Sequence, residues 1–148
     1  MENAPNVTTL SVLPALAVSK TQPNVVFANV LLAGAGAAAP TITDGGGIAS
    51  SVTRAGVGVY QVRLNCRAQP STAGAPMAFV YAQLVNDGAV PAPDGWTVIL
   101  SKVEDATVSG TVVNIVNVYL FDATGAAADL TATDAYLSLL FCLVGGPF

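Results

Sequence analysis

The chain has 148 residues, of which 53% are hydrophobic and only 9% are charged, with a formal net charge of −4. A chain of this length buries roughly 68–70% of the surface that its unfolded form exposes, so we expect one domain with its own core. The five basic residues form no run or patch. This excludes nucleic-acid binding, which depends on neutralising phosphates with Lys and Arg.

The low charge also bears on how the surface is covered. An ordinary soluble domain is about 25% charged. Two explanations are open: a surface coated with Thr and Ser, as in a secreted domain, or a surface largely buried against copies of the chain or another partner. The second is favoured because a lone monomer of this composition is expected to be poorly soluble.

No segment predicts secretion or membrane insertion. The first residues lack the basic region of a signal peptide, and the most apolar windows, 25–39 and 135–144, are shorter than the ~20 residues that span a bilayer. We expect a soluble protein, made in a cytoplasm. Cys66 and Cys142 each lie in an apolar, strand-like run. Buried, reduced thiols are the favoured interpretation, and a disulfide between them is the alternative.

Residues 1–24 are predicted to form an extended arm, because Pro5, Pro14 and Pro23 interrupt them and proline disfavours both helices and central strands. A short strand is expected over 7–13. The arm is too apolar for a solvated tail, so we expect it to dock on a neighbouring subunit or on a capsid. The predicted contact residues are Val7, Leu10, Val12, Leu13 and Leu16, together with Phe148 at the end of the chain.

From residue 25 on, β signals dominate: Val and Thr are abundant, and turn residues recur at short intervals. Strands are predicted over 25–33, 48–53, 58–67, 77–85, 96–103, 111–121 and 136–144. No stretch keeps the 3.6-residue apolar period of a helix. Such a series predicts an all-β domain over 25–148, an antiparallel β-sandwich of the jelly-roll type.

The sequence offers little for catalysis. It has no histidine, so the commonest general base and metal ligand is missing, and with it Ser-His and Cys-His nucleophile pairs. Trp96 opens a predicted strand after a turn; core packing is the favoured interpretation, and an exposed loop contact is the alternative. We therefore expect no enzyme, no cofactor and no metal.

Four of the nine acidic residues are placed at turns. These four stand close to a turn glycine, where Asp accepts hydrogen bonds from backbone N–H groups: Asp44, Asp87, Asp94 and Asp122. A calcium site at a loop is the disfavoured alternative for Asp122, Asp129 and Asp134, because hard cations take oxygen ligands but this spacing fits no known loop pattern.

Two stretches resemble a known family. Residues 52–64, VTRAGVGVYQVRL, resemble the T-x-x-G-x-G-x-Y-x-V-x-L strand of many phage virion proteins. Residues 116–130, leading into 136–141, resemble the C-terminal hairpin of the same proteins. These are head decoration (cement) or head-fibre-like proteins of tailed bacteriophages, with trimeric jelly-roll domains akin to the C1q/TNF fold. The resemblance covers about residues 47–145 and leaves out the arm.

The resemblance implies a homotrimer on the outer surface of a phage head, assembled in the host cytoplasm, which contacts the major capsid protein and bridges capsomers. The alternative is a head-fibre or spike module that binds a host receptor or glycan through loops 68–76 and 86–95. A fibre head usually follows a long shaft, which an arm with three prolines cannot form. We therefore favour the decoration protein over the fibre, and both over a small hydrolase.

Overall fold

The computed structural model describes residues 24–65, 78–85, 93–131 and 136–145. These residues contain nine strands and no helix, and hence no helix long and apolar enough to cross a membrane. The strands are β1 Asn24–Ala33, β2 Thr41–Asp44, β3 Ala49–Gly56, β4 Val59–Leu64, β5 Ala78–Val85, β6 Thr97–Leu100, β7 Glu104–Val108, β8 Thr111–Phe121 and β9 Tyr136–Gly145.

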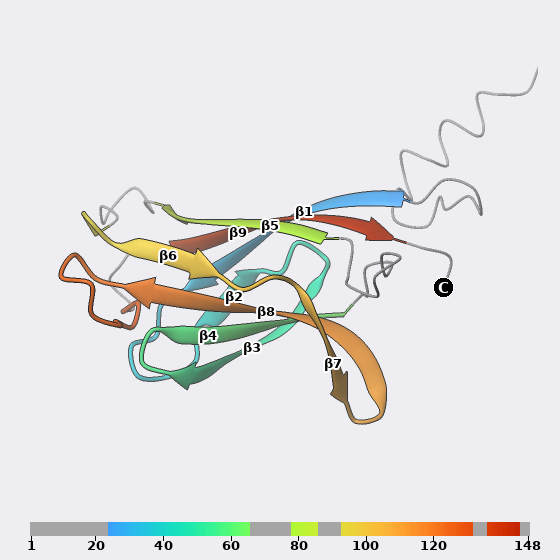
Figure 1. Ribbon diagram of the computed structural model, residues 1–148, viewed down its shortest axis with the longest axis horizontal. Coiled ribbons are helices and arrows are strands. Elements are labelled where there is room, and N and C mark those ends of the chain that lie inside the picture. Colours follow the sequence, from blue (N-terminus) through green and yellow to red (C-terminus); the bar gives the residue numbers. More distant parts are fainter. Residues whose placement is uncertain (1–23, 66–77, 86–92, 132–135, 146–148) are drawn as a thin grey trace, which may run out of the picture.

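The strands form two antiparallel sheets that pack face to face (Figure 1). One has the order β2-β1-β9-β5 and is called the β9 sheet below. The other, the β8 sheet, has the order β3-β4-β8-β6, and β7 also pairs with β8. The predicted antiparallel β-sandwich is therefore confirmed, whereas the jelly-roll type stays a prediction.

The pairing is nested along the chain. The first strand, β1, pairs with the last, β9, from Asn24 opposite Gly145 to Leu32 opposite Leu137. Inside this pair, β4 pairs with β8, from Val59 opposite Tyr119 to Arg63 opposite Ile115. The pairing of β1 with β9 therefore holds the first and last strands of the domain together.

The core lies between the sheets and follows the two-residue alternation of each strand. Val30, Leu32, Leu139 and Phe141 of the β9 sheet are fully buried, and Tyr60, Val62, Val116 and Val118 face them from the β8 sheet. Burying one such side chain contributes roughly 1.5–3 kcal/mol. Because alternate residues point inward, the residues between them point away from the core.

Two of the nine strands were not predicted. β2 is only four residues long, and of these Ile42 alone packs against the core, so its alternation is too short to detect. β7 begins with Glu104 and Asp105, which are unfavourable in strands. It is held by pairing with β8 through the turn at Ser109 and Gly110, whose φ angles are 50° and 80°. Positive φ at both positions is the geometry of a tight hairpin turn.

Candidate functional site

Large hydrophobic side chains are exposed on the outer face of the β9 sheet. In the described part of the chain, eight large hydrophobic residues are exposed, and five of them lie on this face: Val25, Phe27, Phe79, Tyr81 and Leu140. Phe27 is 72% exposed and Phe79 is 63% exposed. They point outward because their neighbours along each strand fill the core.

The register of the strands places these side chains in rows. Phe27 of β1 lies opposite Cys142 of β9, which lies opposite Phe79 of β5. In the next row, Asn29, Leu140 and Tyr81 follow one another across the same strands. Directly opposed residues have Cβ atoms about 4.5–5.5 Å apart, so each row forms a continuous contact.

We call this surface the apolar face. It consists of Val25, Phe27, Asn29, Leu31, Phe79, Tyr81, Gln83, Ser138, Leu140, Cys142 and Val144. None of these side chains is charged. Its three strands, spaced about 4.8 Å apart and up to ten residues long, give a footprint on the order of 450 Å². Exposed apolar patches of about 300–600 Å² are often functional.

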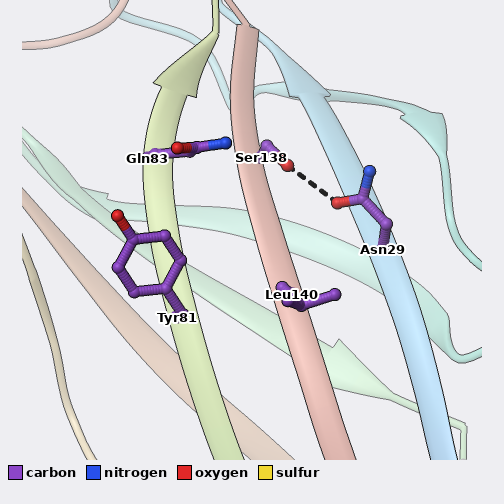
Figure 2. A pocket seen from close by; sticks show the side chains of 5 residues that line it. All are labelled: Asn29, Tyr81, Gln83, Ser138 and Leu140. Atoms are coloured by element: carbon purple, nitrogen blue, oxygen red, sulfur yellow. Dashed lines mark hydrogen bonds between the residues drawn. The ribbon is translucent and has the colours of Figure 1, made fainter.

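A shallow hollow of about 250 Å³ lies within the apolar face (Figure 2). Tyr81 and Gln83 of β5 line one side of it and Asn29 of β1 the other, with Ser138 and Leu140 of β9 between them. Ser138 Oγ donates a 2.7-Å hydrogen bond to Asn29 Oδ1. The hollow therefore offers amide, hydroxyl and phenol groups but no carboxylate, amine or imidazole.

The outer face of the β8 sheet is different. Its cross-strand row of Thr53, Gln61 and Asn117 is polar, and Gln61 Nε2 donates a 3.1-Å hydrogen bond to Asn117 Oδ1. Arg63 lies one row away, opposite Ser51. The next row, Val59, Tyr119 and Ile99, is apolar. The β8 sheet therefore also has hydrophobic side chains on its outer face, but that face includes the charged Arg63, whereas the apolar face has no charged residue.

Asp129 links two parts of the domain through its carboxylate. Its carboxylate accepts hydrogen bonds from Arg54 Nε at 2.9 Å and Nη2 at 2.7 Å, and from the Gly58 N–H at 2.9 Å. Tyr60 accepts a 2.8-Å hydrogen bond from the Leu130 N–H and contacts Asp129 Oδ1 through its hydroxyl at 3.4 Å. The hydrogen bonds from Arg54 lower the pKa of Asp129, and burial raises the pKa of Tyr60.

The calcium alternative receives no support from this geometry. Asp129 is held by Arg54, and Asp122 is engaged in its own turn, where its Oδ1 accepts hydrogen bonds from the Thr124 N–H and hydroxyl and from the Ala126 N–H. These bonds lower the pKa of Asp122, the hydroxyl of Thr124 most of all. No three His, Cys, Asp or Glu side chains cluster among the described residues. Asp134 lies outside those residues.

The predicted turn-capping role is confirmed at two positions. Besides Asp122, Asp44 accepts a 2.8-Å hydrogen bond from the Gly46 N–H. Asp94 is exposed and precedes Gly95, whose φ is 75°. Asp87 lies outside the described residues.

Several predicted contact residues also lie outside the described residues. They are Val7, Leu10, Val12, Leu13, Leu16 and Phe148. The predicted loop 68–76 and residues 86–92 of the predicted loop 86–95 also lie outside the described residues. Trp96 is half-buried and packs against the core, as the favoured interpretation predicts.

The cysteine prediction needs a correction at one position. Cys142 has a free thiol, but it is half-buried on the apolar face instead of in the core, because the neighbouring Phe141 and Leu143 take the inward positions. Cys66 lies outside the described residues, so its burial stays a prediction. The free thiol of Cys142 gives no support to a disulfide between the two.

Sequence reasoning did not single out Phe27 or the apolar face as a whole. A signal was present: β1, β5 and β9 carry apolar residues at both inward and outward positions. Antiparallel sheets with one solvated face show clean alternation instead. Strands that are apolar on both sides therefore predict a covered outer face.

No family model, curated protein or solved structure matches the chain. Support for a function therefore comes from the residues themselves and from the geometry of the apolar face.

Proposed function

We propose that the protein is a non-enzymatic structural subunit of a homo-oligomer, which associates through its apolar face. The observation that carries this proposal is the uncharged face on which Phe27, Phe79 and Tyr81 are each more than half exposed. Removing apolar surface from water is favourable by about 25 cal/mol per Å². Another copy of the chain is a suitable partner, because the apolar face would bury no charge of its own in such a contact.

In its specific form, the proposal is a homotrimer that decorates the outer surface of a phage head. It would contact the major capsid protein and stabilise the shell by bridging capsomers. The resemblance of residues 52–64 and 116–141 to phage decoration proteins supports this form. The nested pairing of β1 with β9 and of β4 with β8 is also what a jelly roll requires, since that fold combines Greek keys across two sheets.

The acidic residues support a non-enzymatic role. A carboxyl group that acts as a general acid or base must lie within reach of a substrate. Asp44 and Asp122 instead accept backbone hydrogen bonds within their own turns, and Asp129 is paired with Arg54.

One observation favours a second candidate, a head-fibre or spike module that binds a host glycan. The hollow on the apolar face combines an aromatic ring, Tyr81, with the amides of Asn29 and Gln83. Such uncharged groups suit a neutral, hydroxyl-rich ligand, because a few placed polar groups orient a ligand in an otherwise apolar site. The two candidates differ in whether the apolar face is covered by a copy of the chain or left open.

The test is the native mass of the full chain, measured by light scattering over a wide range of concentrations, followed by co-sedimentation with heads that lack the protein. We expect a trimer of the 14.9-kDa chain that binds to heads. A trimer that binds glycans but not heads would favour the fibre module. A monomer at every concentration would overturn the homo-oligomer and association of copies through the apolar face.

A further inference from the structure

The edge strands of the two sheets differ in how they are protected. An edge strand presents unpaired N–H and C=O groups, and proteins usually protect it with charges, prolines, bulges or a very short length. β2 has four residues and ends at Asp44. β3 has two register shifts and carries Arg54. On the opposite edge of the β8 sheet, β6 and β7 are separated by a break that contains Lys102.

β5 has none of these features. It is eight residues long, AFVYAQLV, with no charge, proline or glycine. It pairs with β9 at every position from Ala78 to Val85 without a register shift. Among the described residues, no strand pairs with its other side. Its outer main-chain groups are therefore arranged to pair with one more strand.

We propose that residues 6–13 of a neighbouring copy add to β5 as this strand, an inference that rests on the proposed homo-oligomer. These residues, NVTTLSVL, lie between Pro5 and Pro14. Every one of them has a backbone N–H, whereas a proline within the segment would lose a hydrogen bond. The segment is as long as β5, is uncharged, and is rich in Val and Thr, which favour strands.

Strand addition would also enlarge the apolar face. The added strand would lie directly beside β5, so its outward side chains would contact those of Phe79 and Tyr81 in the same cross-strand rows. An uncharged segment suits this place, because a charged one would be desolvated beside aromatic side chains. The edge and the face would then form one continuous interface between copies.

The topology favours a neighbour's segment over the chain's own. β1 and β5 begin at the same end of the sheet, since Asn24 lies opposite Gly145 and Ala78 lies opposite Leu143. To reach the outer side of β5, the chain's own arm would have to cross the end of β9 and the segment that enters β5. Connections at one end of a sheet rarely cross. Residues 14–23, which extend to about 33 Å, are long enough to lead to an adjacent copy.

The experiment cross-links two different copies of the full chain. One chain carries Leu10→Cys or Ser11→Cys in the arm, and the other carries Tyr81→Cys or Gln83→Cys in β5. Leu10 and Ser11 point to opposite sides of an extended strand. In either strand orientation, one of them therefore lies on the same face of the sheet as Tyr81 and Gln83. The two chains, both with Cys66→Ser and Cys142→Ser, are co-expressed and treated with a short bismaleimide.

We expect a cross-linked pair of unlike chains in at least one combination. Adding Thr8→Pro or Thr9→Pro to the arm chain should lower its yield at least tenfold in one of the two cases. Adjacent N–H groups of the added strand point to opposite sides, so one of these prolines removes a donor that faces β5. Ala17→Pro is the matched control outside that strand and should leave the yield unchanged. If Thr8→Pro and Thr9→Pro both give the same yield as Ala17→Pro, the proposal is overturned.

Two further outcomes separate this proposal from the one it rests on. If the chain is oligomeric but no combination cross-links, or a doubly substituted chain cross-links only within itself, the neighbour's strand is overturned and the homo-oligomer stands. If the unsubstituted chain is a monomer at every concentration, both are overturned.

Discussion

Phe27 of β1 and Phe79 of β5, far apart in the sequence, flank Cys142 of β9 in a single row across the outer face of one sheet. Both rings are largely exposed, although three strands of regular pairing hold their backbones in place. A rigid, exposed aromatic pair needs little ordering when it binds, which lowers the entropic cost of association. The row is therefore the centre of the surface through which we expect copies of the chain to associate.

The first prediction concerns a charge placed in the row of Phe27, Cys142 and Phe79. Phe27→Asp should weaken association roughly 30-fold or more, because loss of a central interface aromatic costs about 2 kcal/mol or more and the carboxylate would also be desolvated. Ile99→Asp is the matched control, since Ile99 is 50% exposed on the outer face of the β8 sheet. Native mass measured against concentration compares the two. Equal dissociation by both variants would contradict a role specific to the apolar face.

The second prediction concerns the Cys142 thiol, which lies between the two rings. In a Cys66→Ser background, association should shield this thiol, so a maleimide should label it at least tenfold faster after Phe27→Asp than before. Mass spectrometry of timed samples gives the rates. Labelling of Cys142 in a urea-unfolded sample of each protein controls for the reagent. If folded Cys142 reacts at the same rate in the oligomer and in the variant, the row lies outside the interface.

The third prediction separates two glycines in the left-handed region. Gly58 has φ +64°, and a Cβ there would approach the Leu120 carbonyl oxygen to 2.5 Å. Gly125 has φ +83° with open space around it. Gly125→Ala should cost about 1 kcal/mol for the backbone conformation alone, and Gly58→Ala about 3 kcal/mol or more because of the added clash. Urea unfolding at one protein concentration measures both, and equal losses would show that the close approach is relaxed at little cost.

The fourth prediction is a pH dependence that comes from Asp129. Hydrogen bonds, chiefly from Arg54, hold its pKa below the ordinary value of 3.8 in the folded protein. A carboxyl with a lowered folded-state pKa adds stability that is fully present well above 3.8 and is lost as the pH falls through the folded-state value. Between pH 6 and pH 3, the free energy of unfolding should therefore fall less in Asp129→Asn than in the unsubstituted chain.

The same variant should be less stable at neutral pH by about 1–3 kcal/mol, because the Gly58 N–H and the guanidinium lose a charged acceptor. Asp94→Asn, at an exposed turn, is the control and should change stability by less than about 0.5 kcal/mol. Denaturant titrations at a series of pH values provide both results. Parallel pH curves for the unsubstituted chain and Asp129→Asn would rule out this contribution of Asp129.

Much of the fold could be predicted from local pattern. The alternation around Tyr60 and Val62 marked a half-buried strand, and the turns after β1 and β8 were marked by glycine and Asp. The turn roles of Asp44 and Asp122 follow from the same local chemistry, since the hydrogen bonds join residues two to four positions apart. The sequence also predicts a surface covered by copies of the chain, because so few charged residues cannot coat a monomer, and this stays a prediction.

Only the tertiary structure decided which residues meet. Phe27, Cys142 and Phe79 become neighbours through pairing of strands from the two ends and the middle of the chain. Arg54 likewise pairs with Asp129, 75 positions away in the sequence. Where a strand is apolar on both sides, as in β1, β5 and β9, its alternation does not say which side faces the core. That choice depends on which sheet packs against the strand, so the apolar face exists only once both sheets have formed.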